Sequence, residues 1–186
     1  MKKQIAIPTI ALFVICLVAT ALLALANNVT APIIDELAKK TEIESRQKVL
    51  SSATDFKDGK QGDIVYATGY DKDGKPVGLI FTTTEKSYGG DVQVMTGIDT
   101  DGKVTGVEIL SINDTAGLGQ KATEESFRSQ FVGLIKDIVV QKNSSNHDNN
   151  EITALTGATI TSKAVTGAVN DALAQYETVM AKGGAY

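Results

Sequence analysis

The sequence predicts an α+β protein in which a single N-terminal transmembrane helix precedes one domain with an antiparallel sheet packed against helices. Three observations predict this architecture. Residues 5–26 form an apolar run without a charge, the middle of the chain carries two strand–turn–strand patterns, and two later segments have helical spacing of apolar residues. We therefore divide the 186 residues into a transmembrane anchor (1–28), a helical stalk (29–52) and one domain (53–186).

The apolar run IAIPTIALFVICLVATALLALA is about long enough to cross a bilayer as a helix. Lys2 and Lys3 precede it, and positive residues favour the cytoplasmic side, so we expect a single-pass protein of the cell (inner) membrane. Its N-terminus would be cytoplasmic and its domain extracytoplasmic. A cleaved signal peptide is the alternative, with ALA-NN as a cleavage site, but its apolar region is usually shorter.

The segment at residues 30–50 is predicted to be a helix, because Pro32 suits a first turn and a broken apolar stripe follows. We expect SSATDFKDGKQGD, after it, to be a loop. The pattern G-x-D-x-D-G-K-x-x-G then occurs twice, at residues 69–78 and 97–106. Asp-Gly between alternating strands predicts two β-hairpins, and the four strands are expected to form one antiparallel sheet. Counting from Asp71, the twelfth position is Thr82 instead of the glutamate of an EF-hand, so we do not interpret the pattern as a calcium loop.

The last third of the chain is predicted to hold two helices and a short strand. The first helix follows Thr123 as N-cap, with Phe127 and Phe131 on one face. A strand begins at Ile138, and a polar loop around His147 follows. The final helix extends to about residue 180, with a buried stripe of Val165, Ala168, Val169, Ala172, Leu173 and Tyr176.

Composition excludes several classes of function. One cysteine cannot form an internal disulfide, and one histidine cannot form a multi-histidine metal site. The net charge is −4, and beyond Lys2 and Lys3 there is no long basic run, so nucleic acid is not an expected partner.

The stretch TGATITS at the start of the final helix contains four hydroxyl side chains: Thr156, Thr159, Thr161 and Ser162. In one interpretation, Thr156 or Thr159 caps the helix and the other hydroxyls lie on the surface. In the other, the helix N-terminus binds an anion, and Gly157 and Ala158 leave room for a phosphate. No histidine or cysteine adjoins the stretch, so a covalent bond to a hydroxyl would be made by another enzyme.

The run TGATITSKAVTGAV resembles the flavinylation motif of the FMN-binding domain family, whose core is [ST]-G-A-[ST]. The segments NVTAPII, GIDTDGKVTGVEIL, NDTAGLG and TEESFRSQFVG precede it in this order. With the N-terminal apolar run, they make most of the chain similar to the G subunits of Rnf-type electron-transport complexes. The family's loop usually reads E-T-P-G-L-G, whereas this chain has D-T-A-G-L-G at residues 114–119.

This resemblance implies a covalent FMN. In the family a flavin transferase uses FAD, releases AMP and joins FMN through its phosphate to the hydroxyl that corresponds to Thr159. Thr156, Gly157 and Ala158 would be recognised by the transferase, and Thr161 and Ser162 would hydrogen-bond near the phosphate. The ring would lie between the start of the final helix and a loop whose flavin-lining residues are Asp114, Thr115, Gly117, Leu118 and Gly119. Tyr88, before two glycines, is a weaker candidate.

The resemblance further implies an electron carrier without a substrate pocket of its own. Its partners would be the other membrane subunits of a complex that moves electrons between reduced ferredoxin and NAD and couples this to sodium or proton movement. The alternatives are a membrane-anchored extracytoplasmic binding or structural domain without covalent flavin, and a stand-alone extracellular reductase.

Overall fold

The computed structural model describes residues 2–135, 137–143 and 145–183, and it divides the chain into two compact units, Met1–Ile43 and Glu44–Tyr186. The first unit consists of helix α1 (Lys2–Val49) up to its residue 43. Among the described residues, α1 is the one helix long and apolar enough to cross a membrane; its most apolar window has a mean hydropathy of 2.7 and is not buried in protein. A signal sequence also meets this criterion of length and composition.

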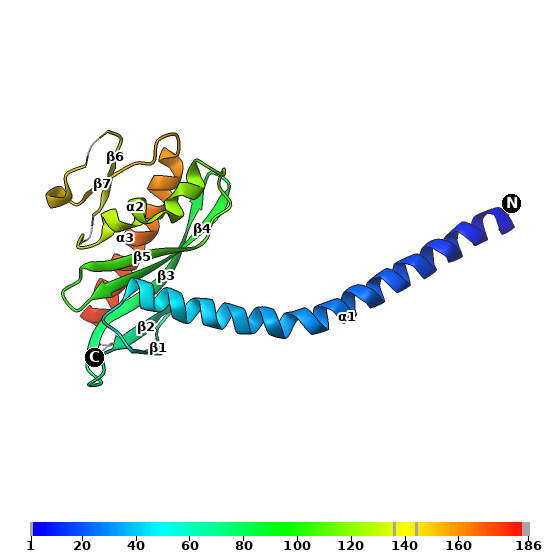
Figure 1. Ribbon diagram of the computed structural model, residues 1–186, viewed down its shortest axis with the longest axis horizontal. Helices are drawn as coiled ribbons and strands as arrows, with labels where there is room; N and C mark the ends of the chain where they lie inside the picture. The colour runs from blue at the N-terminus through cyan, green and yellow to red at the C-terminus, as the bar shows by residue number, and fades with distance from the viewer. Residues whose placement is uncertain (1, 136, 144, 184–186) are drawn as a thin grey trace. The chain divides into compact units, whose positions relative to one another are not determined.

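The second unit is built on an antiparallel sheet whose strands follow chain order (Figure 1): β1 (Asp55–Gln61), β2 (Ile64–Tyr70), β3 (Pro76–Ser87), β4 (Gly90–Asp99) and β5 (Val104–Ser111). Both predicted hairpins are present, with Gly74 and Gly102 at positive φ in their turns. In the first turn, the Asp71 carboxylate accepts the backbone N–H groups of Asp73 and Lys75 at 2.9 and 2.8 Å. Asp99 does the same in the second turn, so these aspartates close the hairpins.

The prediction of a loop at SSATDFKDGKQGD is wrong for residues 55–61, which form β1 and pair with β2. Charged side chains and a glycine hide any apolar alternation in this strand. It is an edge strand, where charged residues are common, and its pairing with β2 makes it extended. The Lys57 ammonium also lies 4.9 Å from the centroid of the Tyr70 ring across the ladder.

Helix α3 (Thr159–Ala181) packs on β3 and β4 and buries the predicted stripe completely. The same core includes the short elements after the sheet: η1 (Gly119–Thr123), α2 (Glu125–Arg128) and η2 (Ser129–Phe131). A smaller apolar cluster contains Val49, Leu50, Ala67, Ile80 and Met95. The predicted α+β architecture of a sheet packed against helices is therefore confirmed.

The helix predicted after Thr123 is shorter than expected, because α2 is only four residues long. Thr123 is not its N-cap: that position is Glu124, and the Thr123 hydroxyl instead donates to the carbonyl oxygen of Gln120 at 2.8 Å. Phe127 and Phe131 are buried together as predicted, with ring centroids 5.6 Å apart.

A second, parallel ladder joins β6 (Val139–Gln141) to β7 (Glu151–Thr153). The first of these strands is predicted from the sequence, whereas β7 is not, since three residues are too few to show a period. His147 lies exposed in the short helix η3 (His147–Asn149) of the intervening polar segment.

The glycines that flank the repeated pattern have a packing role that the pattern alone does not show. Gly97 and Gly106 lie against Val49, the last residue of α1, while Gly69 and Gly78 lie against Leu50, which follows it. A Cβ atom on Gly97 would be 2.2 Å from the carbonyl oxygen of Val49, and one on Gly69 would be 2.5 Å from the Leu50 side chain. The Thr105 hydroxyl donates to the same Val49 oxygen at 2.5 Å. Val49 and Leu50, assigned to the stalk from the sequence, are thus buried in the second unit; the boundaries 1–28, 29–52 and 53–186 stay predictions.

Candidate functional site

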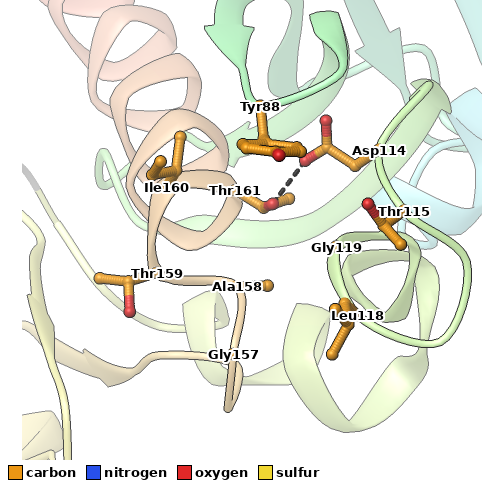
Figure 2. Close-up of a pocket in the computed structure, with 10 residues that line it drawn as sticks. All are labelled: Tyr88, Asp114, Thr115, Leu118, Gly119, Gly157, Ala158, Thr159, Ile160 and Thr161. Carbon is orange, nitrogen blue, oxygen red and sulfur yellow. Dashed lines mark hydrogen bonds between the residues drawn. The ribbon is translucent and has the colours of Figure 1, made fainter.

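A cavity of about 480 Å³ lies where three segments of the second unit meet (Figure 2). Its volume is within the range of small-molecule sites, roughly 300–1,000 Å³. The β3–β4 turn contributes Tyr88, the loop after β5 contributes one wall, and the start of α3 contributes the other. The lining residues are Tyr88, Asp114, Thr115, Leu118, Gly119, Gly157, Ala158, Thr159, Ile160 and Thr161.

Eight of the eleven residues predicted for the site line this cavity. The other three, Thr156, Gly117 and Ser162, do not. Ile160 is not among the predicted site residues. The sequence does show that it is an apolar residue opposite the buried stripe of α3, and 56% of its surface is exposed in the structure. Tyr88, the weaker candidate, is also at the cavity, with 74% of its surface exposed.

Asp114 connects the three segments that form the cavity. The residue is only 3% exposed. One carboxylate oxygen, Oδ1, accepts the backbone N–H of Gly89 at 2.6 Å. The other, Oδ2, accepts the hydroxyl protons of Ser87 and Thr161 in short hydrogen bonds, the second of which is drawn in Figure 2. The Asp114 side chain therefore holds residues that lie 25 to 47 positions away from it in the chain.

These hydrogen bonds determine the charge of the carboxyl group. Burial alone raises the pKa of Asp114, but the hydroxyls of Ser87 and Thr161 and the backbone N–H groups of Gly89 and Tyr88 stabilise the ionised form more. The net result is a pKa below the ordinary value of 3.8, so Asp114 is a buried anion at neutral pH.

The capping interpretation of the hydroxyl cluster is wrong. The N-cap position of α3 is Ala158, and no side chain caps the helix. The Ser162 hydroxyl instead accepts the N–H of Leu155 and donates to the carbonyl oxygen of Ala158, both at 2.9 Å. Thr161 and Ser162 are buried and are not surface residues. Within the described part of the chain, the half-buried Thr159 is the member of the cluster that both lines the cavity and has a hydroxyl without a protein hydrogen bond.

Two glycines allow the walls to approach each other. Gly157 has a φ of 78°, and a Cβ atom there would be 3.2 Å from Leu118 on the opposite wall. A Cβ atom on Gly119 would be 2.5 Å from that of Asp114 and 2.7 Å from the Thr161 hydroxyl. Gly119, which is predicted to line the flavin, thus also makes a close contact inside the protein. Gly117 has a φ of 77° and faces open space.

The chemistry of the cavity suits a flat ring system that carries a phosphate. Leu118, Ile160 and Tyr88 supply exposed apolar surface around it. The first backbone N–H groups of α3 have no partner within the helix and no side-chain cap, and such a helix N-terminus favours an anion. Figure 2 shows Thr159 and Ile160 on one side and Leu118 on the other, with Gly157 and Ala158 between them.

Comparison with known proteins identifies relatives along most of the chain. Residues 87–174 match the FMN-binding domain model. The G subunit of the Na(+)-translocating ferredoxin:NAD(+) oxidoreductase complex of Acetobacterium woodii is 40% identical over 184 residues, which cover 89% of this chain and 88% of the relative. The G subunit of the proton-translocating ferredoxin:NAD(+) oxidoreductase complex of Clostridium ljungdahlii is 33% identical, with 90% and 89% covered.

Solved structures support the fold. The C subunit of the Na(+)-translocating NADH-quinone reductase of Parabacteroides distasonis matches with a TM-score of 0.50 and 24% identity over 61% of this chain and 59% of that one. Shewanella oneidensis NqrC matches with a TM-score of 0.51 and 17% identity over 65% of each chain. The shared part is thus less than two thirds of either neighbour, and at these identities the likeness concerns the fold alone.

The cavity lies within the matched segment, and the curated relatives cover nearly the whole chain at up to 40% identity. The chain therefore belongs to the family of G subunits of ion-translocating ferredoxin:NAD(+) oxidoreductase complexes, with an FMN-binding domain at residues 87–174.

Proposed function

We propose that this chain is the flavoprotein electron-carrier subunit of a membrane-bound, ion-translocating ferredoxin:NAD(+) oxidoreductase complex of the Rnf type. Its FMN is joined covalently through the phosphate to the hydroxyl of Thr159. The observation that carries the proposal is the cavity, because its walls combine apolar surface with the uncapped start of α3 and the Thr159 hydroxyl. The match to the FMN-binding domain and the names of the relatives support the same function.

The residues at the cavity divide into two groups in this proposal. The first-turn N–H groups of α3 hold the phosphate at Thr159, and Gly157 leaves space for it beside the backbone. Leu118 and Ile160 pack on the ring and exclude water from it. When bound, FMN supplies one- and two-electron transfer, whereas the protein supplies attachment, orientation and electrostatics.

Attachment requires a separate flavin transferase. In the proposed step, the Thr159 Oγ1 forms a bond to the phosphorus on the riboflavin side of FAD, the pyrophosphate bond breaks and AMP leaves. The hydroxyl proton passes to a base on the transferase, because the titratable side chains at the cavity are Tyr88 and the Asp114 carboxylate, which is already hydrogen-bonded to Ser87, Gly89 and Thr161. Thr156, Gly157 and Ala158 are the proposed recognition residues.

We also propose that α1 is retained as the membrane anchor, with a cytoplasmic N-terminus and an extracytoplasmic flavin domain. The apolar segment that begins at Thr9 and the positive residues Lys2 and Lys3 support this topology. In that position the protein relays electrons between neighbouring centres of the complex.

In-gel fluorescence tests the covalent bond directly. The full chain is produced with the flavin transferase, denatured, separated by electrophoresis and viewed under ultraviolet light before staining. We expect a fluorescent band for the wild type and none for Thr159→Ala. Thr178→Ala is a control, because its exposed hydroxyl lies on the same helix but does not line the cavity.

Each outcome has a distinct meaning. A dark wild-type band would refute the covalent flavin and favour a binding or structural domain without one. A band of unchanged brightness in Thr159→Ala would move the bond to another hydroxyl. A fluorescent chain that purifies from membranes without other subunits would favour a stand-alone reductase over a member of a complex.

A further inference from the structure

We propose that Asp114 is a positioning residue whose ionised carboxylate joins the three walls of the cavity and so determines how the flavin ring is seated. The inference rests on the proposed function for the identity of the ring. The hydrogen bonds that it invokes belong to the protein itself and can be tested without any cofactor. They begin at the Asp114 side chain in the loop after β5 and reach the β3–β4 turn and the first turn of α3.

Both oxygens of this carboxylate are used by protein donors. Oδ1 accepts from Gly89 at 2.6 Å, while Oδ2 accepts from two hydroxyls, and the residue is almost completely buried. Because the Asp114 carboxylate is enclosed and both of its oxygens are hydrogen-bonded, it affects a ligand through the residues that it holds. Asp114 is therefore assigned to positioning, and direct contact with the ring is left to its neighbours.

The neighbours that it holds are the ones that face the cavity. Tyr88 lies between the two donors of the β3–β4 turn, Ser87 and Gly89, so both of its flanking residues are fixed by the carboxylate. Thr161 directly follows Ile160, so the same carboxylate also fixes the first turn of α3. In Figure 2 the Asp114 and Thr161 side chains meet beside the Tyr88 ring.

Two glycines make this convergence possible. A Cβ atom on Gly89 would be 2.3 Å from the carbonyl oxygen of Asn113, and one on Gly119 would be 2.5 Å from the Cβ of Asp114. Real Cβ atoms do not approach other atoms this closely, so both positions require glycine for the loop to reach its partners. The cluster is thus enclosed on both sides by backbone.

The other charged groups nearby do not compete for the carboxylate. Tyr88 is the other titratable side chain that lines the cavity. The charged side chains on the β3–β4 hairpin and on the first turns of η1 and α3 make no hydrogen bond to Asp114 within the described part of the chain: Glu85, Lys86, Asp91, Lys121 and Lys163.

The first experiment uses the flavin-free full chain, produced without the transferase, labelled with ¹⁵N-glycine and held in detergent micelles. The amide proton of Gly89 is followed from acidic to neutral pH. We expect its resonance to titrate in the wild type with a midpoint below 3.8, the ordinary pKa of an aspartate, and to show no such titration in Asp114→Asn. Asp91→Asn removes an exposed carboxylate from the same hairpin and should titrate like the wild type.

Two further variants keep the test decisive if Asp114→Asn does not fold. Ser87→Ala and Thr161→Val each remove one donor and retain the carboxylate. We expect the Gly89 midpoint to move upward in both, because the ionised form loses a hydrogen bond. A wild-type Gly89 amide that does not respond to pH, or midpoints that are unchanged in both variants, would overturn the inference.

The second experiment measures ring seating in the flavin-loaded full chain. We expect Asp114→Asn to retain the in-gel fluorescence of the wild type and to lose most of the visible circular dichroism of the bound flavin. Asp91→Asn should retain both. Equal dichroism in Asp114→Asn and wild type would overturn the role of Asp114 in seating the ring. A dark wild-type band would instead overturn the proposed function, and the Gly89 titration would then test the hydrogen bonds to Asp114 without the flavin.

Discussion

Replacing Gly97 with alanine is expected to destabilise the second unit, because the added methyl group has no space. Its Cβ would be 2.2 Å from the carbonyl oxygen of Val49 and 2.7 Å from the Thr105 hydroxyl. The Val49 atoms are backbone, so a side-chain rotation cannot relieve the overlap, and the end of α1 must move away from the sheet.

The size of the effect follows from three contributions. Overpacking a close contact costs about 1–3 kcal/mol. Displacing Val49 also breaks its 2.5 Å hydrogen bond from Thr105, a net loss of about 0.5–1.5 kcal/mol. Alanine restricts the unfolded chain more than glycine does and returns about 0.4–1 kcal/mol. The expected net decrease in the free energy of unfolding is therefore about 0.5–4 kcal/mol.

Gly167→Ala is the matched control, since the same chemical change is made where space exists. Gly167 lies inside α3, and a Cβ there would be 3.5 Å from Glu85, an ordinary contact. Alanine is the better helix former, so this variant should be more stable by about 0.5–1 kcal/mol. Urea unfolding of the full chain in micelles, followed by far-ultraviolet circular dichroism, compares the two. Equal changes of the same sign would refute the contact between Gly97 and Val49.

Three further predictions concern hydrogen bonds. Asp114→Asn should lower the free energy of unfolding at neutral pH by about 1.5–3 kcal/mol. Because the pKa of Asp114 is depressed in the folded state, the difference in stability from the wild type should shrink as the pH falls below about 4. A difference that stays constant with pH would contradict this prediction. Ser162→Ala leaves the Leu155 N–H without its acceptor and should cost about 1–3 kcal/mol in the same urea assay. Asp99→Ala removes the acceptor of two exposed turn amides and should cost about 0.5–1.5 kcal/mol, whereas Asp101→Ala in the same turn should change stability little.

Local sequence patterns were sufficient to predict the strands and helices that have a regular spacing of apolar residues or a defined turn. The two hairpins follow from Asp-Gly turns between alternating residues, and the stripe of α3 follows from helical spacing. Strands β1 and β7 have neither signal, because one is charged and the other is three residues long. Their extended conformation comes from the strands with which they pair.

The candidate site, too, could be predicted from the sequence only in part. The motif resemblance selected Thr159 and the loop at residues 114–119, and eight of the eleven selected residues line one cavity. It could not show that Thr161 and Ser162 are buried within the protein, since a hydroxyl has the same sequence signal whether it contacts a ligand or a carboxylate.

The sequence by itself determined the apolar N-terminal run, the hairpins, the final helix and the family, because these depend on neighbours along the chain and on short motifs. Only the tertiary structure decided that Asp114 gathers Ser87, Gly89 and Thr161 and that Gly97 lies against Val49. Those contacts join residues far apart in the chain, and their energies depend on distances and burial that exist only after folding.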